Sequence, residues 1–68
     1  MGDRTPYWVI SHGNEWAVKL EGENEVMQTF SSHEDAREEA IRLAKEHTPS
    51  EIKVQGEDGN IVERQSYD

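Results

Sequence analysis

Hydrophobic and polar positions alternate along the first thirty residues in a way that predicts three β-strands. Residues 7–10 are aromatic and β-branched, which suits a strand, and residues 16–20 alternate as a half-buried strand should. Between them, Gly13 and Asn14 tolerate positive φ and predict a tight turn. A further turn leads into a third expected strand over residues 25–30. The first half of the chain therefore predicts a three-stranded meander.

A helix is expected next, because apolar residues then recur at helical spacing. Either Ser31 or Ser32 can supply the N-cap oxygen, since each has an acidic residue three positions later. Pro49 ends the helix near residue 47. The apolar stripe consists of Ala36, Ala40, Leu43, Ala44 and His47. Because alanine dominates this stripe, the helix can approach its sheet closely.

Two more strands are expected over residues 52–55 and 61–65. The Asp58-Gly59 pair between them is typical of a hairpin turn. The order β-β-β-α-β-β predicts an α+β fold: an antiparallel sheet, made of a three-stranded meander plus a C-terminal hairpin, with one helix packed on one face. Residues 1–68 are interpreted as a single domain, in which residues 1–5 are a flexible N-terminal tail.

The hairpin register divides the strand residues between the two faces of the sheet. A two-residue loop at positions 13–14 fixes the pairing of the first two strands. The pairs assigned to the core, under the helix, are Tyr7–Leu20, Val9–Val18 and Ser11–Trp16. The same face is expected to take Val26, Phe30, Ile52, Val54 and Ile61. A loop one residue longer or shorter would exchange the two faces.

The opposite, helix-free face is expected to hold Lys19 and an apolar patch. The members of this candidate interaction surface are Trp8, Ile10, Ala17, Met27 and Val62. Scattered exposure is the simpler interpretation, since apolar atoms supply more than half of any protein surface. Trp and Met are, however, enriched at contact surfaces. We expect a protein partner or a second copy to bind here, with pairing of edge strands as an alternative route to a homodimer.

Composition adds a strong negative charge to this picture. The chain has 7 Lys and Arg residues against 15 Asp and Glu, a net charge of −8. Phosphate backbones are repelled by such a surface, so direct nucleic-acid binding is not expected. The simplest interpretation is a solvated surface that aids solubility. The alternatives are a salt-adapted host and a phage- or plasmid-borne decoy that imitates nucleic acid and occupies a basic groove of another protein.

Residue types that carry chemistry are few, and none forms a recognisable site. The chain has no cysteine. His33 and His47 would lie about 21 Å apart along the helix, and His12 could approach only one of them, so no metal site is expected. The serines have simpler roles in turns and caps, the glycines form no phosphate-binding loop, and the carboxylate pairs lack a cleft. We therefore expect no enzymatic activity, cofactor or small-molecule ligand.

The same reasoning applies to membranes and targeting. The first residues are polar and resemble no secretory signal. No stretch approaches the ~20 apolar residues that a membrane-spanning helix needs. A cytoplasmic protein without membrane contact is therefore the expectation.

Three stretches together resemble a family of small bacterial proteins called domain of unknown function 2188. They are residues 7–19 (YWVISHGNEWAVK), 30–40 (FSSHEDAREEA) and 51–67 (EIKVQGEDGNIVERQSY). The most specific parts are the His-Gly-x-x-Trp-Ala-Val segment and the Gly-x-Asp-Gly-x-Ile hairpin. Ser11 departs from the family, in which a proline usually precedes the histidine. The resemblance implies a short meander, one helix and a closing hairpin, and it implies no catalytic residues.

Overall fold

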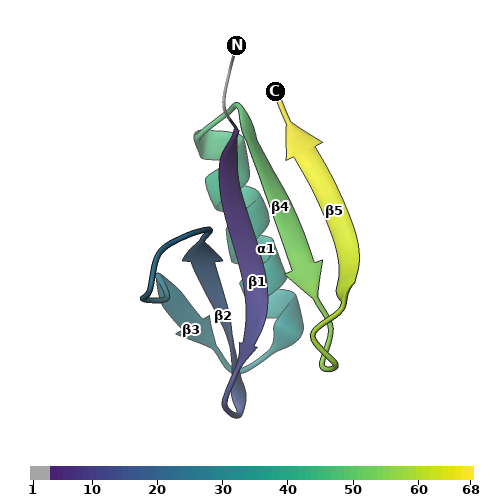
Figure 1. Cartoon of the computed structure of the whole chain (residues 1–68). Helices are drawn as coiled ribbons and strands as arrows, with labels where there is room; N and C mark the ends of the chain where they lie inside the picture. Colours follow the sequence, from purple (N-terminus) through teal and green to yellow (C-terminus); the bar gives the residue numbers. More distant parts are fainter. Residues whose placement is uncertain (1–3) are drawn as a thin grey trace.

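The computed structural model describes residues 4–68, and its elements follow the predicted order. The elements are β1 (Thr5–His12), β2 (Glu15–Leu20), β3 (Gln28–Phe30), α1 (His33–Glu46), β4 (Ser50–Gln55) and β5 (Ile61–Tyr67). The five strands form one sheet, and α1 lies against one of its faces (Figure 1). Residues 1–3 of the expected tail lie outside the described residues, and Thr5 already belongs to β1.

The sheet is mixed, so the expectation of a purely antiparallel sheet is wrong. The strand order is β3-β2-β1-β4-β5, and the central strands β1 and β4 run parallel, with Val9 opposite Val54. The reason is one of direction. The meander β1-β2-β3 reverses twice, so β3 runs the same way as β1, and α1 then carries the chain back to the end at which β1 starts. A strand that begins there and lies beside β1 must run parallel to it.

The predicted pairing of β1 with β2 is confirmed residue by residue. The structure pairs Tyr7 with Leu20, Val9 with Val18 and Ser11 with Trp16. The connecting turn is Gly13-Asn14, in which Gly13 has a φ of +65°, a conformation that glycine adopts without strain. Asn14 has no positive φ, and a positive φ at the first central position alone is the feature of a type II′ turn, whose twist matches that of the flanking strands.

The third strand is shorter than predicted. β3 covers Gln28–Phe30 rather than residues 25–30. The contact between this segment and β2 begins at Met27, one residue before β3, because the Met27 amide donates a hydrogen bond to the Val18 carbonyl at 2.7 Å. Phe30 pairs with Trp16 and contacts the core. Val26, which we expected in the core, is half-buried in the loop before the strand.

The helix begins after Ser32, which decides between the two predicted caps. The Ser32 Oγ accepts a hydrogen bond from the Asp35 amide at 3.0 Å, the arrangement of an N-cap. The alanine stripe faces the sheet as predicted, and Ala36, Ala40 and Ala44 have no exposed surface. His47 caps the C-terminal end and is exposed rather than part of the stripe. The buried core consists of these alanines with Tyr7, Val9, Val18, Ile52 and Val54.

The closing hairpin contains a β-bulge that the sequence reasoning missed. Gln55 pairs with Ile61, whereas its neighbour Val54 pairs with Glu63, so Val62 is an extra residue on β5. Because directly paired residues share a face, Ile61 lies on the face of Gln55, away from the helix. The prediction that Ile61 points into the core is therefore wrong, and its side chain is 37% exposed.

Two arginines connect separate elements of the fold. The Arg37 guanidinium on α1 holds Glu63 of β5 through two hydrogen bonds of 2.7 and 2.9 Å. This bidentate contact lowers the pKa of Glu63 below its ordinary value. At the other end of the sheet, Arg4 donates to the carbonyls of Ser50 and Tyr67. Arg4 also forms an ion pair with Asp68.

Candidate interaction surface

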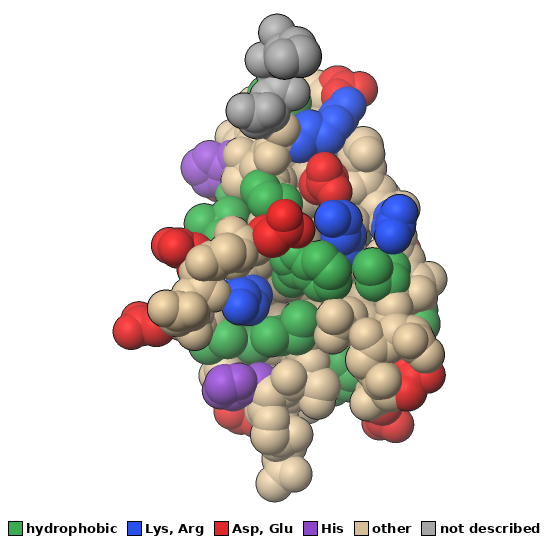
Figure 2. Space-filling model, viewed as in Figure 1, with side chains coloured by type: hydrophobic (Ala, Val, Ile, Leu, Met, Phe, Trp, Pro, Cys, Tyr) green, Lys and Arg blue, Asp and Glu red, His purple; other side chains and the backbone are tan. Residues whose placement is uncertain are grey.

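The candidate interaction surface lies on the sheet face opposite α1, which we call the open face. Figure 1 shows α1 behind the sheet, so Figure 2, in the same orientation, shows the open face. Trp8 and Ile10 of β1 are half-buried near its centre. Met27, just before β3, is 49% exposed, and Val62 of β5 is 63% exposed. The structure therefore brings Trp8, Ile10 and Ala17 together and places Met27 and Val62 toward the two edges.

Ala17 differs from the other members because it has no exposed surface at all. Its strand position is the predicted one, opposite Ile10 of β1 and Thr29 of β3. Alanine is the shortest side chain in this cross-strand row, so its larger neighbours cover it. Ala17 thus forms the floor of the surface and offers nothing for a partner to touch.

Trp8 is held in place by two polar partners. Its indole Nε1 donates a hydrogen bond to the Glu21 carboxylate at 2.9 Å. The Lys53 ammonium lies 5.1 Å from the ring centroid, within the range of a cation–π contact. The hydrogen bond from Trp8, followed by the charge of Lys53, lowers the pKa of Glu21 below its ordinary value. The ring is therefore a fixed aromatic group rather than a mobile one.

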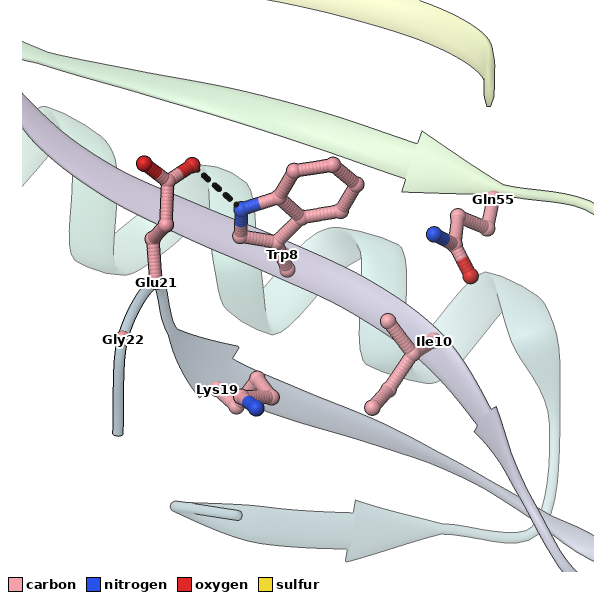
Figure 3. A pocket seen from close by; sticks show the side chains of 6 residues that line it. All are labelled: Trp8, Ile10, Lys19, Glu21, Gly22 and Gln55. Atoms are coloured by element: carbon pink, nitrogen blue, oxygen red, sulfur yellow. Dashed lines mark hydrogen bonds between the residues drawn. The ribbon is translucent and has the colours of Figure 1, made fainter. Parts of the chain in front are cut away.

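A shallow depression opens beside the ring. Its volume is about 270 Å³. The residues around it are Trp8, Ile10, Lys19, Glu21, Gly22 and Gln55. Figure 3 shows that these residues come from β1, from the end of β2 and the loop that follows it, and from the last residue of β4. The volume is below the roughly 300–1,000 Å³ of pockets that enclose small molecules, and it suits a single side chain of a partner.

A row of cations crosses the open face at the level of Trp8. Trp8 pairs with Lys19 of β2 on one side and with Lys53 of β4 on the other. Lys53 in turn pairs with Arg64 of β5. We call these four residues, three cations and the Trp8 ring among them, the cationic row. The β1–β2 register predicted Lys19 on this face, but Lys53 and Arg64 could not be placed without the parallel β1–β4 pairing.

The three histidines do not come together. His33 contacts Trp16 edge-to-face, with ring centroids 4.4 Å apart, and its Nε2 lies 3.1 Å from the Gln55 carbonyl. It therefore joins α1 to β2 and β4. His12 ends β1 and His47 caps α1, and both are exposed. Among residues 4–68, no three His, Asp or Glu side chains are placed to hold a metal ion.

The two most specific segments of the family resemblance meet at one end of the sheet. A second depression of about 250 Å³ there is lined by Trp16, His33, Gly56 and Glu57. Trp16 of β2 and His33 of α1 are in contact with each other, so the residues at this end help to join the helix to the sheet.

Comparison with known proteins settles the family. The sequence model described as "Uncharacterized protein conserved in bacteria (DUF2188)" matches residues 7–67. The chain belongs to the DUF2188 family. This confirms the resemblance drawn from the sequence, over nearly the whole chain. No curated protein and no solved structure matches this DUF2188 chain. Within the part of the chain that the structure describes, no helix combines the length and apolar character needed to cross a membrane.

Proposed function

We propose that this DUF2188 protein is a non-enzymatic, cytoplasmic module that binds another protein through its open face. The observation that carries the proposal is Trp8, an aromatic side chain fixed at the centre of a sheet face that no other element among residues 4–68 covers. Tryptophan is prominent among the residues that dominate binding energy at protein interfaces. A ring that is already held loses little conformational freedom when a partner arrives.

The surroundings of Trp8 support a protein as the partner. Ile10, Met27, Val62 and Ile61 add apolar surface on both sides of the ring. The depression next to it is too small for a typical small-molecule ligand. The partner is either another protein or a second copy of the chain.

The acidic-decoy alternative has weaker support. A decoy needs free carboxylates in a phosphate-like array, but many carboxylates here are engaged by the chain's own cations. Those in ion pairs include Glu21, Glu39, Glu46, Glu51 and Glu63.

Site-specific photo-crosslinking in cells of the source organism tests the proposal. A benzophenone amino acid placed at Met27 or Val62 lies on the open face, whereas one at Glu38 lies on the exposed side of α1. We expect covalent protein adducts from positions 27 and 62 but not from position 38. Adducts with the mass of two chains identify a homodimer. The same adducts from all three positions, or none from positions 27 and 62, would contradict the proposal.

A substitution in the same surface supplies the control. Trp8→Ser combined with Ile10→Thr should abolish the adducts from positions 27 and 62. If the adduct is a homodimer, sedimentation should show the wild type as a dimer and this variant as a monomer. Circular dichroism of the variant checks that it still folds.

A further inference from the structure

The cationic row indicates what kind of partner fits the open face, provided that the proposed function is right. We infer that the open face binds an acidic peptide segment of a partner protein. Carboxylates of the segment contact Lys19 and Arg64, and an apolar side chain between them enters the depression beside Trp8.

Two of the three cations that form no ion pair among residues 4–68 lie on this face. Lys53 is already neutralised, since its ammonium lies 3.5 Å from both Glu21 and Glu51. Among residues 4–68, Lys19 and Arg64 form no ion pair, and they lie on opposite sides of Trp8. Figure 2 shows Lys and Arg side chains on both sides of the central hydrophobic cluster. Two unpaired cations around an apolar centre complement a segment with two acids around an apolar residue.

The arginines of α1, in contrast, are not free. Arg42 binds Glu39 and Glu46, and Arg37 binds Glu63. Lys45 is the α1 cation without an ion pair among the described residues, and it does not line the depression beside Trp8. The attraction for an acidic segment is therefore concentrated on the open face.

The spacing of the row predicts the pattern of the segment. Lys19 and Arg64 are three strand positions apart, which corresponds to about 14 Å at ~4.8 Å between strands. An extended peptide advances about 3.3 Å per residue, and every second side chain points the same way. Acids four residues apart therefore match the two cations, and the residue midway between them faces the protein. The pattern is acid–x–apolar–x–acid.

A short segment fits better than a nucleic acid. A polyanion with a charge on every residue would place charges beside Glu21 and Glu51, which flank Lys53 in the middle of the row. One longer than the row would also approach the acidic residues of the β2–β3 loop. The acid–x–apolar–x–acid segment instead places its uncharged apolar residue at the middle of the row and its acids at the two ends. The acids of α1 lie on the far side of the sheet (Figure 1), and salt screens charges beyond about 8 Å at physiological ionic strength.

An NMR titration of the full ¹⁵N-labelled chain tests the inference. The probe is the acetylated and amidated peptide Ser-Asp-Ser-Leu-Ser-Glu-Ser. We expect shifts of the Trp8 indole signal and of the Lys19 and Arg64 amides, without shifts along α1. The same peptide with Asn and Gln in place of its two acids should bind about tenfold more weakly, because both ion pairs are lost.

Two lysine substitutions separate local contact from overall charge. Lys19→Glu and Lys45→Glu change the net charge equally, and neither breaks an ion pair within residues 4–68. Only Lys19 lies on the open face. Lys19→Glu should weaken binding of the acidic peptide about five- to tenfold, since attraction becomes repulsion, whereas Lys45→Glu should change it less than about twofold. Equal losses would overturn the inference.

Three other results would also overturn it. Tighter binding of a short single-stranded oligothymidine at the same signals would assign the row to nucleic acid. Shifts of the Trp8 signal with protein concentration alone would assign the face to a second copy. Absence of peptide shifts, while photo-crosslinks from positions 27 and 62 still capture a protein, would reject the acidic segment but leave the proposed function standing.

Discussion

The two faces of the sheet are formed by alternate residues of the same strands, yet they differ in what they contribute. On the helix side, residues such as Val9 and Ile52 have no exposed surface and meet the alanines of α1. On the open face, Trp8 and Lys53 are only half-buried and form a cation–π contact with each other. The face under the helix therefore supplies most of the stability. The other face is thereby free to carry larger and charged side chains for binding.

Two isoleucines on opposite faces provide the largest test of this comparison. Ile52→Ala removes a fully buried side chain from the core and should lower the free energy of unfolding by about 2–5 kcal/mol. Ile10→Ala makes the same truncation at a half-buried position on the open face and should cost about 1 kcal/mol. Urea unfolding followed by circular dichroism measures both. Equal losses would show that the open face is part of the core.

Two alanines provide a smaller test, by addition rather than removal of volume. Ala40→Leu forces a larger side chain between α1 and the sheet, where Ala40 has no exposed surface, and should cost about 1–3 kcal/mol. Ala17 is equally buried, but only side chains that can move into solvent cover it. Ala17→Leu should therefore cost less than about 1 kcal/mol in the same urea experiment. A reversed order would contradict our account of how Ala17 is covered.

The Arg37–Glu63 contact predicts the smallest effect, and one that depends on pH. The hydrogen bonds from Arg37 lower the pKa of Glu63 in the folded chain below its ordinary value of 4.5. A lowered pKa stabilises the fold above the ordinary value, and this stability is lost as the pH falls through the folded value. Glu63→Gln should therefore lower the free energy of unfolding at pH 7. Below pH 7, the free energy of unfolding of this variant should fall less steeply with decreasing pH than that of the wild type.

A double-substitution cycle checks the source of that effect. In a chain that already carries Arg37→Gln, the further change Glu63→Gln should no longer alter how the free energy of unfolding depends on pH, because the two side chains act together. If Glu63→Gln still flattens the profile in the Arg37→Gln background, the interaction with Arg37 is not the cause.

Local features of the fold could be predicted from the sequence because neighbouring residues determine them. The two-residue turn at Gly13-Asn14 fixes the β1–β2 register, and with it the faces on which Trp8 and Val9 lie. Helical spacing likewise identifies the buried alanines of α1. The turn and the helical spacing together therefore predict three members of the candidate interaction surface, which are Trp8, Ile10 and Ala17.

The remaining features depend on contacts between distant segments. The parallel pairing of β1 with β4 follows from where α1 returns the chain, and it places Lys53 beside Trp8. The bulge at Val62 moves Ile61 out of the core. Neither has a signal in the local pattern. The cationic row therefore became visible only after the strands were assembled.

The contacts of Arg4 with the C-terminal residues have a practical consequence for protein engineering. Arg4 binds Asp68 and the Tyr67 carbonyl, so the first and last described residues leave the sheet side by side, far from the β1–β2 turn (Figure 1). Neighbouring ends are what insertion into a loop of a host protein requires. A DUF2188 domain grafted in this way would hold its β1–β2 and β4–β5 turns at the end away from the host protein (Figure 1).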